Sequence, residues 1–69
     1  MADPVLAHLR DELIRVMHEN AETLREEASV SPSEETLAQQ ERSLALVRAV
    51  SADFLAALRR EIESRRPQD

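Results

Sequence analysis

The chain is 69 residues long and has no cysteine, so it forms at most one small domain, and neither disulfides nor a thiolate metal site can stabilise it. It carries 14 acidic and 9 basic side chains, for a net charge of −5, which disfavours binding to nucleic acid or to anionic membrane surfaces. Its apolar runs are far shorter than the roughly 20 residues that cross a bilayer. The N-terminal Met-Ala-Asp-Pro has no basic-then-apolar layout. We therefore expect a cytoplasmic protein without a membrane span or a classical export signal.

Two helix-start signals divide the chain. Asp3-Pro4 lies near the beginning, and Ser31-Pro32-Ser33-Glu34 lies near the middle. An aspartate before a first-turn proline, and a serine followed three residues later by a glutamate, satisfy backbone donors that a helix start leaves unpaired. The signals predict a single domain over 1–69, with helices at about 4–28 and about 32–65 and a turn at about 29–31. Because the chain has no glycine, this turn should be serine-rich and lack the usual left-handed cap.

Both segments have the periodicity of amphipathic helices at 100° per residue. In the first, an apolar arc of about 180° is centred on Leu6, Leu13, Met17 and Leu24, with Leu9 and Val16 on one flank and Ile14, Ala21 and Ala28 on the other. In the second, an arc of about 140° is centred on Leu37, Leu44, Leu55 and Ile62, with Val47, Val50, Phe54 and Leu58 to one side. Alternation with a period of two residues is absent and β-branched residues are sparse, so we predict an all-α protein.

The two helices should form an antiparallel hairpin rather than one rod. Pro32 inside a helix would cost roughly 3 kcal/mol, and an unbroken helix would put the two apolar stripes about 220° apart. Val30 should pack into the base of the hairpin as a hydrophobic staple. Folding the chain at about residue 30 predicts four apolar pairings: Leu24 with Leu37, Met17 with Leu44, Leu13 with Val47, and Leu6 or Leu9 with Phe54.

Apolar surface should remain once this hairpin closes, because both arcs are wider than the seam of two helices and Leu58 and Ile62 extend past the first helix. We therefore expect the two-helix hairpin to be completed by oligomerisation or by a helical partner. The expected partner-binding residues are Leu44, Val47, Phe54, Leu58, Ile62, Leu6, Leu13 and Met17. Phe54, the only aromatic residue, is the first anchor to test. A marginally stable monomer whose extra leucines thicken one side is the simpler alternative.

The polar residues form no catalytic, cofactor-binding or metal-binding pattern. His8 and His18 have carboxylates at helical spacing, but no second cluster completes a coordination shell, which favours exposed histidines with weak contacts to neighbouring turns. An acidic end of the first helix, around Glu22, Glu26 and Glu27, is either a solvated surface or a docking patch for a basic partner. Asn20 and Ser51 lie within the apolar arcs, where each either fixes the register or sits at an edge bonded to its own helix. We predict no enzyme, no cofactor and no small-molecule substrate.

A resemblance to a known family rests on residues 10–58. A Leu-Arg-x-x-Leu pattern and an acidic first helix precede Ser31-Pro32-Ser33-Glu34, and Leu37-Ala38-Gln39-Gln40 and Ser43-Leu44-Ala45-Leu46-Val47 follow it. This layout resembles the small helical-hairpin co-chaperones of bacterial type III secretion, the YscE/PscE-like group. The resemblance implies that the hairpin binds a tetratricopeptide-like chaperone and that the two together keep a needle subunit from polymerising before export. The apolar surface left over would then be the docking surface.

Two functions are therefore expected from the sequence. The first is a heteromeric binding module, a co-chaperone or adaptor, whose isolated chain is weakly stable. The second is a self-assembling regulatory or structural bundle, a homodimer or tetramer in which the remaining apolar arcs pair by two-fold symmetry.

Overall fold

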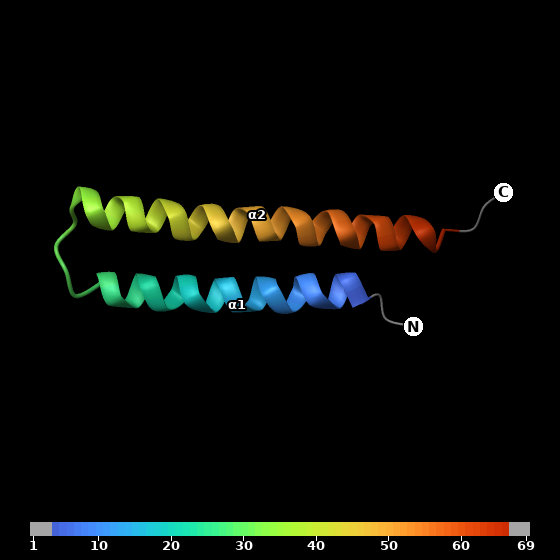
Figure 1. Ribbon diagram of the computed structural model, residues 1–69, viewed down its shortest axis with the longest axis horizontal. Coiled ribbons are helices and arrows are strands. Elements are labelled where there is room, and N and C mark those ends of the chain that lie inside the picture. Colours follow the sequence, from blue (N-terminus) through green and yellow to red (C-terminus); the bar gives the residue numbers. More distant parts are fainter. Residues whose placement is uncertain (1–3, 67–69) are drawn as a thin grey trace.

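The computed structural model describes residues 4–66, and over this range the chain forms two helices and no strand. Helix α1 spans Pro4–Glu27 and helix α2 spans Glu34–Ser64. Figure 1 shows the two helices side by side and antiparallel, joined by a loop at one end, in a molecule of 59 × 19 × 13 Å. The predicted all-α hairpin is confirmed.

Helix α2 begins two residues later than expected, because its cap is Ser33 and not Ser31. Ser33 has extended backbone angles, and its hydroxyl oxygen accepts a hydrogen bond from the Thr36 amide at 3.2 Å. The Ser33 amide in turn donates to Thr36 Oγ1 at 2.8 Å. The capping box therefore joins Ser33 to Thr36, and the prediction of a box between Ser31 and Glu34 was wrong. Because Thr36 completes the box, Glu34 is not part of it. Glu34 and Glu35 both lie in the first turn of α2, where negative charge stabilises a helix.

Helix α1 ends without a left-handed residue, and no described residue has a positive φ. Its last turn tightens, because the amides of Ser29 and Val30 donate to the carbonyls of Glu26 and Glu27 at 3.4 and 3.1 Å. The Ser29 hydroxyl also donates to the Glu26 carbonyl at 2.9 Å. The expected serine-containing turn without glycine is confirmed, although it covers residues 28–33 and is longer than predicted. The proposed Asp3 cap of the first helix lies outside the described residues.

The seam between the helices consists of residues spaced alternately three and four apart, as in an antiparallel coiled coil. These buried or half-buried positions are Leu6, Leu9, Leu13, Val16, Asn20, Thr23 and Glu27 in α1, and Thr36, Gln40, Ser43, Val47, Val50, Phe54, Ala57 and Glu61 in α2. The buried core is small and comprises Leu6, Val16, Val50 and Ala57.

One hydrogen bond across the seam sets the register. The Ser43 hydroxyl donates to Asn20 Oδ1 at 2.6 Å, and both side chains are partly buried. This bond places Val16 opposite Val47 and Leu9 opposite Phe54. Asn20 therefore fixes the register, which was one of the two roles predicted for it, and Ser43 is its hydrogen-bond partner.

Three of the four predicted pairings were wrong. The register that places Val16 opposite Val47 puts Leu13 opposite Val50, so Leu13 does not pair with Val47. Leu24 and Leu37 are both about half exposed, as are Met17 and Leu44. The hairpin closes along a neighbouring stripe, where smaller residues and Asn20–Ser43 allow close packing. Val30 is also exposed, so it does not act as the expected staple at the base of the hairpin.

The seam changes in character along its length. It is mostly apolar toward the open end, where Glu61 is the exception, whereas Asn20, Thr23, Gln40 and Ser43 make it polar near the turn. The Gln40 amide atoms and one Glu27 carboxylate oxygen are buried there without a hydrogen-bond partner in the described structure. Because unpaired buried polar atoms are destabilising, the turn half holds the hairpin together less strongly than the open half.

The capping geometry gives a first testable prediction. Replacing Ser33 by alanine removes the hydroxyl that accepts the Thr36 amide, and we expect the free energy of unfolding to fall by about 1 kcal/mol. Ser31→Ala, two residues away, should change it by less than about 0.5 kcal/mol. Urea unfolding followed by circular dichroism measures both. Equal losses from the two variants would show that Ser33 is not the cap.

Candidate docking surface

One side of the hairpin carries a row of exposed apolar side chains from both helices, which we call the apolar face. Its members are Ile14, Met17 and Leu24 from α1 and Leu37, Leu44, Leu55 and Ile62 from α2, each between 45% and 60% exposed. At 100° per residue, the α1 members and the α2 members are all displaced from the seam toward the same side of an antiparallel pair.

A shallow groove confirms that the two helices contribute to one surface. It is lined by Leu6, Ala7 and Arg10 from α1 together with Leu58, Glu61, Ile62 and Arg65 from α2. Leu58 is half-buried along this groove and links the exposed row to the seam. The apolar face therefore continues from one helix to the other at the open end of the hairpin.

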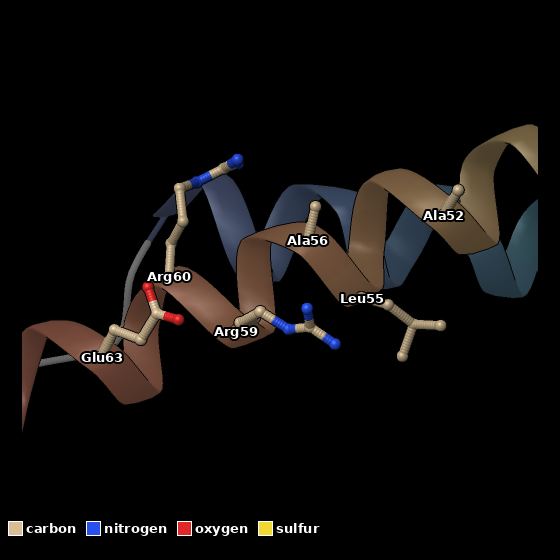
Figure 2. Close-up of a pocket in the computed structure, with 6 residues that line it drawn as sticks. All are labelled: Ala52, Leu55, Ala56, Arg59, Arg60 and Glu63. Carbon is tan, nitrogen blue, oxygen red and sulfur yellow. The ribbon is translucent and has the colours of Figure 1, made fainter.

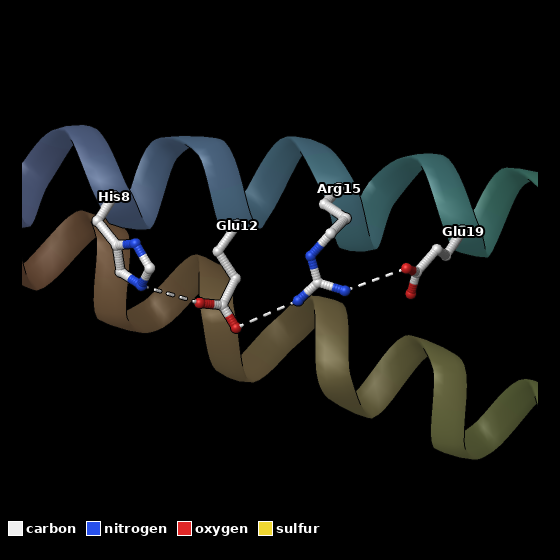
Figure 3. A network of polar contacts seen from close by, with 4 residues as sticks. All are labelled: His8, Glu12, Arg15 and Glu19. Atoms are coloured by element: carbon white, nitrogen blue, oxygen red, sulfur yellow. Dashed lines mark hydrogen bonds and ion pairs between the residues drawn. The ribbon is translucent and has the colours of Figure 1, made fainter.

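The opposite side of the hairpin is polar and charged. Figure 3 shows a chain of contacts along α1, in which Arg15 binds Glu12 at 3.6 Å and Glu19 at 3.1 Å, and His8 lies 3.5 Å from Glu12. Near the turn, a groove on this side is lined by Thr23, Glu26, Val30, Glu35, Gln39 and neighbouring polar residues. Leu46 is an isolated exposed leucine that helical geometry places on the charged side.

The outer side of α2 carries a second shallow groove near the open end. Figure 2 shows its lining residues on the side of α2 that faces away from α1. Leu55 and Arg59 point toward one flank of the helix, whereas Arg60 extends toward the other. An adjoining groove joins Leu55 and Arg59 to Leu58 and Ile62. Arg59 therefore borders the apolar face.

The accessible surface of the chain is large for its mass. It amounts to 5749 Å² for 7.8 kDa, whereas a compact monomer of that mass exposes about 4,400 Å². The difference, on the order of 1,000 Å², is comparable to the roughly 800 Å² that each partner buries in a specific protein complex. A two-helix hairpin therefore exposes more surface than a compact monomer of the same mass, by an amount similar to one partner's share of an interface.

The structure divides the eight predicted partner-binding residues between two places. Met17, Leu44 and Ile62 lie exposed on the apolar face, with Leu58 half-buried beside them. Leu6 is buried, and Leu13, Val47 and Phe54 are half-buried in the seam. Phe54 therefore helps to close the hairpin, and a variant at this position would disturb folding as well as any docking.

Four residues of the apolar face were missing from the predicted set: Ile14, Leu24, Leu37 and Leu55. All four could have been identified on a helical wheel, because they lie with Met17, Leu44 and Ile62 at the centre or on the flank of the apolar arcs.

The other residues considered in the sequence analysis do not come together in one site. The residues described contain no group of three or more histidine, cysteine or acidic side chains that could hold a metal ion. His8 and His18 are both exposed on α1. Neither described helix is long and apolar enough to cross a membrane. Ser51 is half-buried at the edge of the apolar face.

Comparison with known proteins finds no matching family model, no matching curated protein and no matching solved structure.

Substitution by asparagine distinguishes a position in the buried seam from a position on the exposed apolar face. Val50→Asn places an amide in the closed seam, and we expect the free energy of unfolding to fall by about 2 kcal/mol or more. Leu44→Asn introduces the same group where water can solvate it, and the hairpin should lose less than about 1 kcal/mol. Both are measured by chemical unfolding at the lowest concentration that circular dichroism allows. A larger loss for Leu44→Asn would show that the seam has been placed on the wrong stripe.

Proposed function

We propose that this hairpin is a protein-binding module, a small co-chaperone or adaptor that shields apolar helical surface of another protein. The observation that carries this proposal is the row of seven half-exposed aliphatic side chains on one side of both helices. Exposed apolar patches of this extent, bordered by charged residues, are typical of protein interaction sites.

The grooves support binding rather than catalysis. Those on and beside the apolar face are shallow, and leucine, isoleucine, alanine and arginine side chains form most of their lining. A catalytic site usually combines an enclosed pocket with several convergent polar groups. An amphipathic helix laid along the two helices would instead match the linear arrangement of apolar side chains.

The narrower form of the proposal follows the family resemblance. In that form the chain acts in the bacterial cytoplasm with a tetratricopeptide-like chaperone, and the pair holds a needle subunit before its export. Two features support it: the hairpin is small enough to be covered by a helical-repeat protein, and its unburied side is apolar along both helices.

Co-expression tests the proposal directly. The chain is produced with a tetratricopeptide-like chaperone and a needle subunit encoded beside it, and the complex is isolated through a tag on the chaperone. Leu44→Asp should weaken the complex at least tenfold, because a carboxylate would be desolvated in the interface. Leu46→Asp is the matched control, since Leu46 has a similar exposed fraction of 49% but lies on the charged side. A complex that tolerates both variants equally, or no complex with the unchanged chain, contradicts the proposal.

A further inference from the structure

Resting on the proposed use of the apolar face as a docking surface, we propose that a second copy of this chain covers that face when no other partner is bound. The two hairpins pack face to face about a two-fold axis, with the turn of each over the open end of the other. Helix α2 then lies antiparallel to α2 of the second copy, and the product is a four-helix bundle.

The first argument is the symmetry of the exposed row on α2. Leu37 and Ile62 are equally distant from the midpoint between residues 49 and 50, and so are Leu44 and Leu55. An antiparallel α2 pair centred on this midpoint therefore places Leu37 against the second copy's Ile62 and Leu44 against its Leu55. All four side chains are exposed in the isolated hairpin, so this packing covers apolar area without opening the seam.

The second argument is charge at the border of the apolar face. Glu41 and Arg59 are equally distant from residue 50, half a residue from the centre of the apolar pairing, and so are Glu34 and Arg66. Glu41 and Arg59 have the same angular position on α2 at 100° per residue, and Arg59 points the same way as Leu55 (Figure 2). The proposed packing therefore brings each Glu41 to the Arg59 of the other copy. It also brings Glu34 near Arg66, which lies just past the end of α2.

These four charged side chains are available for such pairing. Four arginine–carboxylate ion pairs form within the described hairpin, and His8 lies 3.5 Å from Glu12; these contacts use His8, Glu12, Arg15, Glu19, Glu22, Arg25, Glu61 and Arg65. Glu34, Glu41, Arg59 and Arg66 are exposed and belong to none of them. Each two-fold pairing occurs twice, so the dimer gains four charge contacts that the hairpin alone lacks.

The third argument is the distribution of charge along the whole molecule, which selects between the two possible face-to-face arrangements. The segment 19–41 around the turn contains one arginine, Arg25, and seven glutamates: Glu19, Glu22, Glu26, Glu27, Glu34, Glu35 and Glu41. The end of α2 has an excess of arginine, because residues 59–66 contain Arg59, Arg60, Arg65 and Arg66 against Glu61 and Glu63. Turn against turn would bring like charges together, whereas turn against open end joins opposite charges.

The area is sufficient for a stable pair. On α2 the exposed row runs from Leu37 to Ile62, about 38 Å at 1.5 Å per residue, and across a molecule 19 Å wide it covers on the order of 700 Å², close to the about 800 Å² that each partner buries in a typical specific interface. A partner protein must displace the second copy to reach the same leucines, so self-pairing lowers the apparent affinity for that partner.

Charge exchange tests the proposed orientation. Sedimentation equilibrium of the unchanged chain over a concentration series should give twice the mass of 7.8 kDa. Glu41→Arg and Arg59→Glu should each raise the dimer dissociation constant by about tenfold at low salt, because each creates two repulsive contacts. Combining both substitutions in one chain should restore the dimer. Circular dichroism confirms that all three variants stay helical, and a double variant as weak as the single ones would overturn the orientation.

Cross-linking provides a second, independent readout. The sequence has no cysteine, so an introduced cysteine is the sole thiol that a maleimide reagent can join. Ser51 is half-buried at the edge of the apolar face, within two residues of the proposed axis. Ser51→Cys should therefore join two chains through a short bis-maleimide reagent. Asp53→Cys, exposed on the charged side, is the matched control and should remain uncross-linked.

The outcomes separate this inference from the proposed function. A chain that stays monomeric at all concentrations, or cross-links equally through Ser51→Cys and Asp53→Cys, overturns the self-pairing whether or not the complex with a chaperone forms. A dimer with the expected charge exchange and selective cross-linking supports it. If the chaperone complex then fails to form, only the proposed heteromeric function is lost.

Discussion

The arrangement of this protein depends on which stripe of each helix closes the hairpin. Two helices can bury only one narrow stripe each, yet both helices here carry apolar side chains over a much wider arc. The closed seam buries Val16, Val50 and Ala57 beside larger side chains such as Leu6 and Phe54, and it leaves a row of other leucines, isoleucines and a methionine at its border. The same choice that allows close helix packing therefore produces the apolar face.

Polar residues in the seam explain why this stripe is selected. The bond between Asn20 and Ser43 satisfies two partly buried polar groups at once and can form in only one register. A seam built from Leu24, Leu37, Met17 and Leu44 would bury more apolar area. It would rotate Asn20 and Ser43 away from each other, so their hydrogen bond would be lost. Polar groups near the turn thus provide specificity at some cost in stability, and the unpaired Gln40 amide shows that this cost is present.

The sequence was sufficient to predict the two helices, the turn without glycine, the antiparallel hairpin and the surplus of apolar surface, because periodicity and proline chemistry act locally. It was not sufficient to identify the seam. A helical wheel weights every leucine equally and points to the centre of the apolar arc, whereas the folded hairpin uses one flank of it. The cap was misplaced for a related reason: Ser31 and Ser33 both match the capping pattern, and only the backbone angles of Ser33 distinguish them.

Apolar surface varies across the hairpin, from one side to the other, whereas net charge varies along its length. The two patterns together restrict which partner can bind. Across the hairpin, one side is apolar and the other holds the chain of contacts from His8 to Glu19. Along the hairpin, the turn end is acidic and the end of α2 is rich in arginine. The first division determines which side a partner covers, and the hydrophobic effect drives that contact without specifying direction. The second determines direction, because only a partner with the reverse charge order avoids repulsion at both ends. A second copy turned end for end meets that condition by symmetry. A heteromeric partner must present the same order of charges, basic over the turn and acidic over the end of α2, to compete for the apolar face.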